Sequence, residues 1–255
     1  MKALLKNILI ELCFQLIKKK MKKITMFALL IASSVLQLSA QTWVNWDVNV
    51  PQEKQEEMMV MWNTFMETKT GKALPYNFMS QLEMGEATHN MSLSFIGDDA
   101  DALAALFDYD AIMQNPDFAK PFMWFGQNVE PHRTQTGYQI AGSEQKGGNF
   151  YQALWGIEVA DPATTAAAFV DLIVDTKPLL EEYNVDISIH QALAGQEGAI
   201  SHYILGNFKD YVTFLKASQA MYQSPGFAKF AQATSANVNP LTTTRMLMGA
   251  WNTGE

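Results

Sequence analysis

Two short stretches of the chain are almost alike: Asn-Pro-Asp-Phe-Ala-Lys at residues 115–120 and Ser-Pro-Gly-Phe-Ala-Lys at residues 224–229. They are 109 residues apart, and the same spacing gives 11 identities over residues 101–131. A long, fixed spacing of this kind is typical of an internal repeat. We interpret the chain as a tandem duplication. Its parts are repeat 1 at residues 41–141, a polar, glycine-rich linker at 142–148, and repeat 2 at 149–252.

Outward from these stretches, each repeat gives the same order of elements. In residues 43–50 the apolar side chains Val44, Trp46 and Val48 alternate with polar or aromatic ones, which predicts a strand. Helical spacing of apolar residues follows after Pro51 and again after Pro162. The order in both repeats is strand, helix, strand, strand, helix, strand, and the second helix is split at a proline.

This order resembles the ferredoxin-like unit. Two such units with a split second helix resemble the dimeric α+β barrel superfamily, which includes antibiotic-biosynthesis monooxygenase-like, chlorite-dismutase-related and NIPSNAP-like proteins. The resemblance covers residues 42–252 and implies an α+β fold in which one chain forms a pseudo-dimeric barrel. It rests on topology and repeat length, so no catalytic residue of a named subfamily transfers to this chain.

The first forty residues have the pattern of an export signal and are not expected to form part of the folded domain. Lys22 and Lys23 precede an uncharged apolar run from Ile24 to Leu38, and Ser39-Ala40 supplies small residues for cleavage. We expect a secretory signal peptide that is cleaved after Ala40, with Met21 as the true start and residues 1–20 as a gene-model extension. A double-length signal or a transmembrane anchor are the alternatives. The apolar run is shorter than the roughly 20 residues that a spanning helix needs.

The net charge of the chain excludes some classes of binding partner. The whole chain has 18 basic and 26 acidic residues, and residues 1–40 hold seven lysines and one acid. The remainder therefore has 11 basic and 25 acidic residues, a net charge of −14. Such an acidic chain repels phosphate backbones and anionic lipid, so we expect no nucleic-acid partner and no stable membrane insertion after cleavage. Cys13 is the only cysteine, which excludes a disulfide framework and a cysteine-type zinc site.

The candidate ligand site follows from the strand alternation. Aligning the first strands on Pro51 and Pro162 places Asp47 opposite Glu158, both on the face turned away from the helices. Two enclosed carboxylates would repel each other and raise at least one pKa, as a general base or cation site requires. We predict that a small-molecule pocket, if present, lies on the concave side of the sheets. The predicted lining residues are Asp47, Glu158, His190, Tyr138 and Trp43.

Strong catalytic and cofactor motifs are missing from the sequence. The four histidines show no metal-ligand spacing, and the two arginines are Arg133 and Arg245. We expect a small-molecule binding or non-catalytic protein, with no cofactor or metal, as a monomeric pseudo-dimer or a homo-oligomer. The alternative is a cofactor-independent monooxygenase-like enzyme or a heme-binding enzyme that uses the space between the sheets.

Overall fold

The computed structural model describes residues 41–85, 88–144, 146–196, 198–234 and 241–253. The predicted signal peptide, the start at Met21 and the cleavage site after Ala40 lie outside the described residues. None of the helices within these ranges is long and apolar enough to cross a membrane.

The two halves of the chain follow the element order predicted from the sequence. The first half contains β1 (Thr42–Asn49), α2 (Gln52–Met66), α3 (Lys69–Lys72), β2 (Tyr76–Met84), β3 (Met91–Gly97), the 3-10 helix η1 (Asp101–Leu106), α4 (Tyr109–Gln114), α5 (Pro116–Asn128) and β4 (Glu130–Gly142). The second half contains β5 (Tyr151–Ile157), α6 (Pro162–Glu182), β6 (Asp186–Ala194), β7 (His202–Phe208), α7 (Tyr211–Tyr222), α8 (Pro225–Thr234) and β8 (Leu241–Trp251).

The eight strands form one closed antiparallel barrel in the order β1-β3-β2-β8-β5-β7-β6-β4. Each half supplies four adjacent strands, β4-β1-β3-β2 and β8-β5-β7-β6. The two sets join where β2 pairs with β8 and where β4 pairs with β6. The predicted α+β barrel is therefore present and closes within a single chain. Its origin by duplication stays an interpretation.

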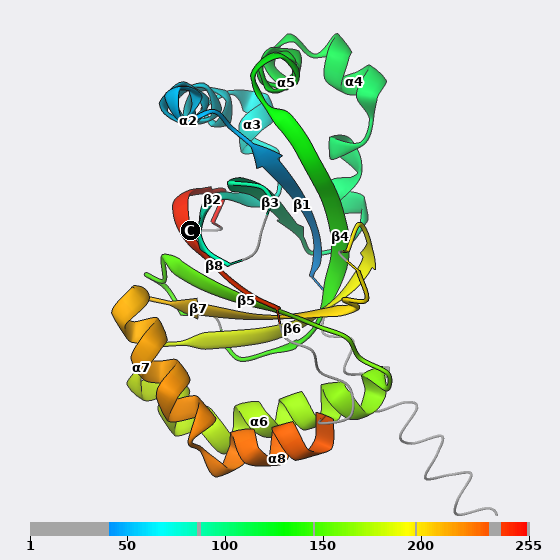
Figure 1. The fold of residues 1–255 in the computed structure, drawn as a ribbon. Coiled ribbons are helices and arrows are strands. Elements are labelled where there is room, and N and C mark those ends of the chain that lie inside the picture. The colour runs from blue at the N-terminus through cyan, green and yellow to red at the C-terminus, as the bar shows by residue number, and fades with distance from the viewer. Residues whose placement is uncertain (1–40, 86–87, 145, 197, 235–240, 254–255) are drawn as a thin grey trace, which may run out of the picture. The chain divides into compact units, whose positions relative to one another are not determined.

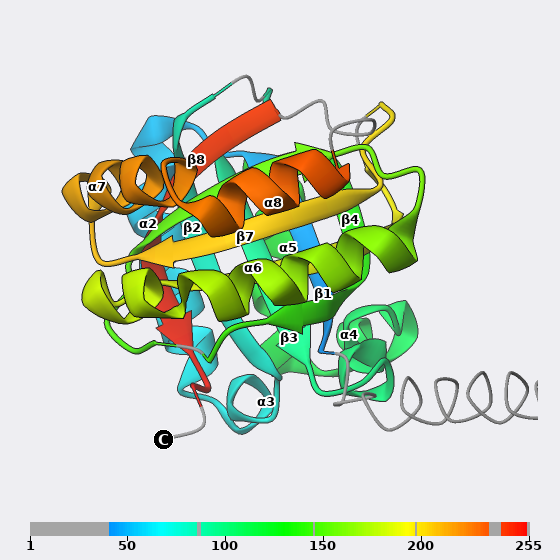
Figure 2. The same cartoon turned by 90° about the horizontal axis from the view of Figure 1, so that it is seen from below.

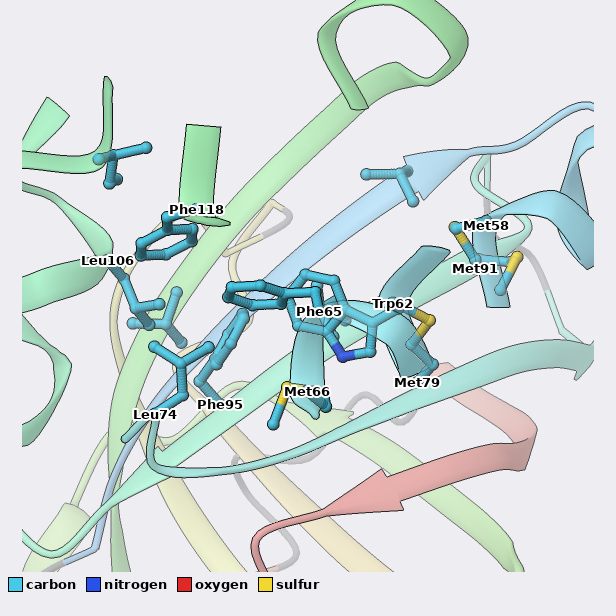
Figure 3. Packing of buried hydrophobic residues seen from close by; sticks show 14 of the residues in the cluster. Met58, Trp62, Phe65, Met66, Leu74, Met79, Met91, Phe95, Leu106 and Phe118 are labelled. Carbon is cyan, nitrogen blue, oxygen red and sulfur yellow. The ribbon is translucent and has the colours of Figure 1, made fainter. Parts of the chain in front are cut away.

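The helices of the two halves cover opposite sides of the barrel (Figure 1). Seen from below, α6 and α8 lie side by side across β7 (Figure 2). On the first side, α2 places Trp62 and Phe65 against Phe95 of β3 and Phe118 of α5 (Figure 3). The Trp62 indole Nε1 donates to Asn77 Oδ1 at 3.2 Å, so the largest buried side chain on this side has its polar atom satisfied. Phe169 of α6 lies at the centre of the second core.

The segment between β3 and α5 contains two short helices, η1 and α4, where local apolar spacing together with Asp98-Asp99 would favour one helix through Met113. Asp99 Oδ1 accepts a hydrogen bond from the Ala102 N–H, and Asp108 Oδ1 accepts one from the Ala111 N–H. Asp108 is the N-cap of α4, so a new helix begins there, and η1 and α4 form in place of one continuous helix.

Strand alternation decides what fills the barrel. In β1 the even-numbered residues Val44, Trp46 and Val48 pack on the first helical core, as predicted, and the odd-numbered ones face the interior. In β5 the odd-numbered residues Ala153 and Ile157 pack on the second core. The interior therefore receives mostly polar and aromatic side chains. They include Trp43, Asn45, Asp47, Phe78, Ser80, Ser92, Ser94, Arg133, Gln135, Gln152, Ser188, His190, Tyr203, Asn207 and Arg245.

Candidate functional site

Asp47 on β1 is the centre of a hydrogen-bonded cluster inside the barrel. Its side chain is 2% exposed. Oδ2 accepts from Arg133 Nη2 at 2.8 Å and from Gln135 Nε2 at 2.7 Å, and Oδ1 accepts from Ser92 Oγ at 2.7 Å. Burial alone would raise the pKa of Asp47, but the electrostatic effect of His89, which is protonated only at acidic pH, the donors Ser92 and Arg133 and the charge of Arg133 outweigh it and lower that pKa. Asp47 is therefore an ionised, fully paired carboxylate.

His89 borders this cluster. Its Nε2 lies 3.5 Å from Asp47 Oδ1, and its ring stacks on that of His132 with a 5.7 Å centroid separation. Its Nδ1 is buried, and no hydrogen-bond partner for it occurs among the described residues. Burial lowers the pKa of His89, more than the negative charge of Asp47 raises it. At neutral pH His89 is therefore uncharged, and Arg133 supplies the positive charge next to Asp47.

A second group joins the two halves of the barrel. The ring of Trp43 on β1 makes edge contacts with His190 on β6 and Tyr203 on β7, each at a centroid distance of 6.2 Å. His190 Nε2 and Ser188 Oγ form a hydrogen bond of 2.7 Å. Trp43 Nε1 and His190 Nδ1 are both buried and have no partner among the described residues. Burial, followed by the charge of Arg245, lowers the pKa of His190 to about 4, so this ring is neutral.

Arg245 on β8 is the second cation of the interior. Its Nε donates to Gln152 Oε1 at 2.8 Å, and its guanidinium carbon lies 5.5 Å from the centre of the Phe78 ring. Burial lowers the pKa of Arg245 to about 10. Its side chain is nevertheless only half-buried, so protein surrounds the guanidinium without covering it completely. Within the described ranges no carboxylate forms an ion pair with it.

A hydrogen bond to Asn207 fixes the orientation of the Gln152 side-chain amide. Its Nε2 donates to Asn207 Oδ1 at 2.7 Å, and Asn207 Nδ2 donates in turn to Asp186. Its Oε1 is thereby left to face Arg245. Burial raises the pKa of Asp186, although Asn207, the Lys146 N–H and Asn149 partly offset that effect.

The structure brings some of the predicted site residues together. Trp43, His190 and Asp47 face the interior, and Trp43 touches His190. The prediction that Asp47 lies opposite Glu158 is wrong, because Glu158 is exposed beyond the end of β5. The alignment on the two prolines caused this error. Residues 50–51 connect β1 to α2, whereas residues 158–161 connect β5 to α6. The longer connection places Glu158 outside β5, whereas Asp47 lies within β1 and pairs with Ser92.

Tyr138 also differs from the expectation. It pairs with Gln191 across β4 and β6, and its hydroxyl donates to the Gln191 side chain. Because His190 faces the interior, the next residue, Gln191, and its partner Tyr138 lie on the outer face of the barrel. A bulge in β4 between Thr136 and Gly137 changes its register against β6, which the sequence pattern does not reveal.

Sequence reasoning did not include Arg245, Gln152 or Phe78 in the site. The available signal was that Arg245 is the single arginine of the second half, within a strand whose other residues are uncharged. Its partners belong to β5 and β2, so only the closed strand order shows that these three residues meet.

A surface hollow of about 450 Å³ lies outside the barrel, between the β1–α2 connection and the end of α5. The Asn90 side chain at its edge is used to hold the backbone of Val50 through two hydrogen bonds. No group of three or more histidine, cysteine, aspartate or glutamate residues suited to a metal ion occurs in the described part of the chain.

Comparison with solved structures supports the fold. A "putative monooxygenase" from Lactobacillus acidophilus NCFM superposes with a TM-score of 0.59 at 9% identity, covering 83% of this chain and 96% of that one. An anthrone oxidase-like protein gives 0.54 at 13% identity, covering 86% and 95%. A "putative chlorite dismutase" gives 0.52 at 7% identity, covering 82% and 95%. At these identities the likeness shows the shared α+β barrel alone. No protein-family model and no curated protein matches the sequence.

Proposed function

We propose that this protein binds a small organic molecule inside its barrel. The observation that carries the proposal is a pair of buried atoms that have no hydrogen-bond partner within the described ranges, Trp43 Nε1 and His190 Nδ1. They lie where the two four-stranded sets of the barrel join. A buried polar group without a partner costs roughly 1–3 kcal/mol. The barrel keeps two such groups on rings that touch each other, and a guest with polar atoms beside these rings would satisfy them.

The surroundings suit such a guest. Small-molecule sites are mostly apolar with a few convergent polar groups. Phe78 and Tyr203 supply aromatic surface, and the paired residues Leu154 and Leu205 supply aliphatic surface on the same interior face. Both leucines are half-buried, although they lie in the middle of their strands.

A cofactor-independent, monooxygenase-like reaction is the second candidate, and the arrangement of His89 favours it. His89 is held neutral by burial, lies beside the paired carboxylate of Asp47, and has an unpartnered Nδ1. A neutral imidazole next to a carboxylate is suited to accept a proton from a bound substrate. Oxygen uptake with phenolic substrates, compared between the wild type and His89→Gln, tests this candidate.

The four histidines are poorly placed to ligate a heme iron. An iron ligand needs a ring nitrogen that faces open space, and Nε2 is committed or misplaced in all four cases. In His190 it bonds Ser188, in His132 it bonds Thr88, and in His89 it lies beside Asp47. His202 pairs with Ile157 on the helix-facing side of the sheet. An absorption spectrum of the purified protein separates heme from a colourless guest.

Native mass spectrometry tests the proposed function. We expect wild-type protein incubated with a metabolite extract to carry extra mass that is absent after unfolding. His190→Phe should lose this mass, because the ring shape stays and the nitrogen is removed. His202→Phe is the control, since His202 is also a strand histidine with little exposure but lies on the helix-facing side of the sheet. Wild-type protein without extra mass, or equal loss in both variants, would contradict the proposal.

Export is part of the same proposal. The basic start, the short apolar run and Ser39-Ala40 support cleavage after Ala40. N-terminal sequencing of protein from its own host should begin at Gln41. Recovery of the full-length chain from the cytosol would contradict export and leave the ligand site unaffected.

A further inference from the structure

Building on the proposed function, we infer that the guest is a flat, apolar acid with a single negative charge, and that Arg245 binds its carboxylate. Three features lead to this inference. They are the free donors of Arg245, the balance of charge inside the barrel, and the aromatic residues around the guanidinium.

The first feature is the geometry of the guanidinium. Arginine has five N–H donors in a planar fork. Only Nε–H of Arg245 has a partner in the described residues, Gln152 Oε1 at 2.8 Å. The chain of hydrogen bonds from Gln152 through Asn207 to Asp186 holds that contact in place. The two terminal nitrogens therefore remain for a ligand, and their geometry matches the two oxygens of a carboxylate.

The second feature is the charge balance. Asp47 forms its ion pair with Arg133 at 2.8 Å, and its charge acts on Arg245 only at longer range, where it raises the pKa of Arg245. Asp186 is occupied by Asn207, Asn149 and the Lys146 N–H. His190 and His89 are neutral because burial lowers the pKa of both. The Arg245 guanidinium therefore has no carboxylate in direct contact within the described residues, and holding a charge inside a protein without a contacting counterion is costly. A monoanion removes that cost, whereas a cation or a neutral guest does not.

The third feature is the shape of the surface near Arg245. The guanidinium lies over Phe78, and Phe78 packs on Tyr76 at a ring distance of 5.8 Å. Arg245 also acts electrostatically on His190, which touches Trp43, so all these groups share one interior. Flat rings on several sides favour a planar aromatic body that stacks between them.

A matched pair of probes tests the inference: 2-naphthoate, which is anionic at pH 7.5, and 2-naphthamide, its neutral counterpart. Binding to the full chain is measured by calorimetry and by tryptophan fluorescence. We expect 2-naphthoate to bind at least about ten-fold more tightly than the amide, because the bond to the guanidinium is charge-assisted. Arg245→Met should abolish this preference, and Arg245→Lys should keep only part of it. Lys177→Met, at an exposed site on α6, is the control and should keep all of it.

Each other outcome is decisive. Equal binding of the acid and the amide would overturn the anionic guest and leave interior binding standing. A preference for the acid that survives in Arg245→Met would assign the charge to a different residue. Binding of neither probe, in protein that carries a guest by mass spectrometry, would refute a flat acid. Binding of neither probe with no guest would refute both this inference and the proposed function.

Discussion

The rings of Trp43 and His190 meet edge-on at 6.2 Å, although β1 and β6 belong to different four-stranded sets. The contact passes over β4, the strand between β1 and β6, and on each ring one buried nitrogen has no hydrogen-bond partner among the described residues. The two sheets therefore meet at this point through aromatic contact, and the polar atoms beside that contact remain for something else to satisfy.

Gly137 on β4 makes room for the Trp43 ring. A Cβ at this position would lie 2.1 Å from the Gln191 carbonyl oxygen and 2.5 Å from Trp43 Cζ2. Gly137→Ala should lower the free energy of unfolding by about 2 kcal/mol or more, as overpacking does, and should alter tryptophan fluorescence. Gly126→Ala in α5 is the control, because a Cβ there meets nothing within 4 Å. An unfolding free energy in Gly137→Ala equal to that of the control would show that Trp43 is not packed on this glycine.

The two carboxylates once expected to face each other should behave differently. Asp47→Asn removes the buried negative charge that accepts from Arg133, Gln135 and Ser92, and breaking such a buried pair costs about 3–5 kcal/mol. Glu158→Gln alters an exposed side chain and should change stability by less than about 0.5 kcal/mol. Urea denaturation of both variants measures the difference. Equal effects would disprove the buried position of Asp47.

Lowering the pH should decrease the free energy of unfolding, partly because His190 resists protonation in the folded protein. Its pKa is about 4 in the folded protein and 6.5 when unperturbed. Between these values the unfolded chain binds a proton that the folded chain excludes, so the stabilisation is complete above pH 6.5 and decreases as the pH falls towards 4. The loss is roughly 3 kcal/mol for this one group. His190→Gln should show a shallower decrease between pH 7.5 and 4.5 in urea denaturation. An identical decrease in the wild type and His190→Gln would contradict a buried, neutral His190.

The repeated phenylalanine should not be equivalent in the two halves. Phe118 is 7% exposed and stacks on Phe65 at 5.3 Å, so Phe118→Ala should cost about 3–5 kcal/mol. Phe227 is only half-buried and Phe230 occupies the core of its layer, so Phe227→Ala should cost less. Thermal unfolding of the two variants provides the comparison, and a larger loss in Phe227→Ala would contradict the packing described.

The sequence was sufficient to predict the order of elements and the faces of the first strands, because both follow from local periodicity. The even residues of β1 and the odd residues of β5 pack on helices as expected. The exposed position of Glu158 could not be predicted from strand alternation, because it depends on the length of the connection between β5 and α6. Tyr138 required the β4 bulge, and Arg245 required knowledge of which strands are neighbours in the closed barrel. These are long-range features that alternation along one strand does not encode.

A crystal structure of the protein purified from its own host is the most direct test of a ligand-binding interior. The account predicts non-protein electron density inside the barrel, within hydrogen-bond distance of Trp43 Nε1 or His190 Nδ1 and extending towards the guanidinium of Arg245. An interior filled by protein side chains, with Trp43 Nε1 and His190 Nδ1 bonded to other residues and Arg245 paired with a carboxylate of the chain, would contradict it.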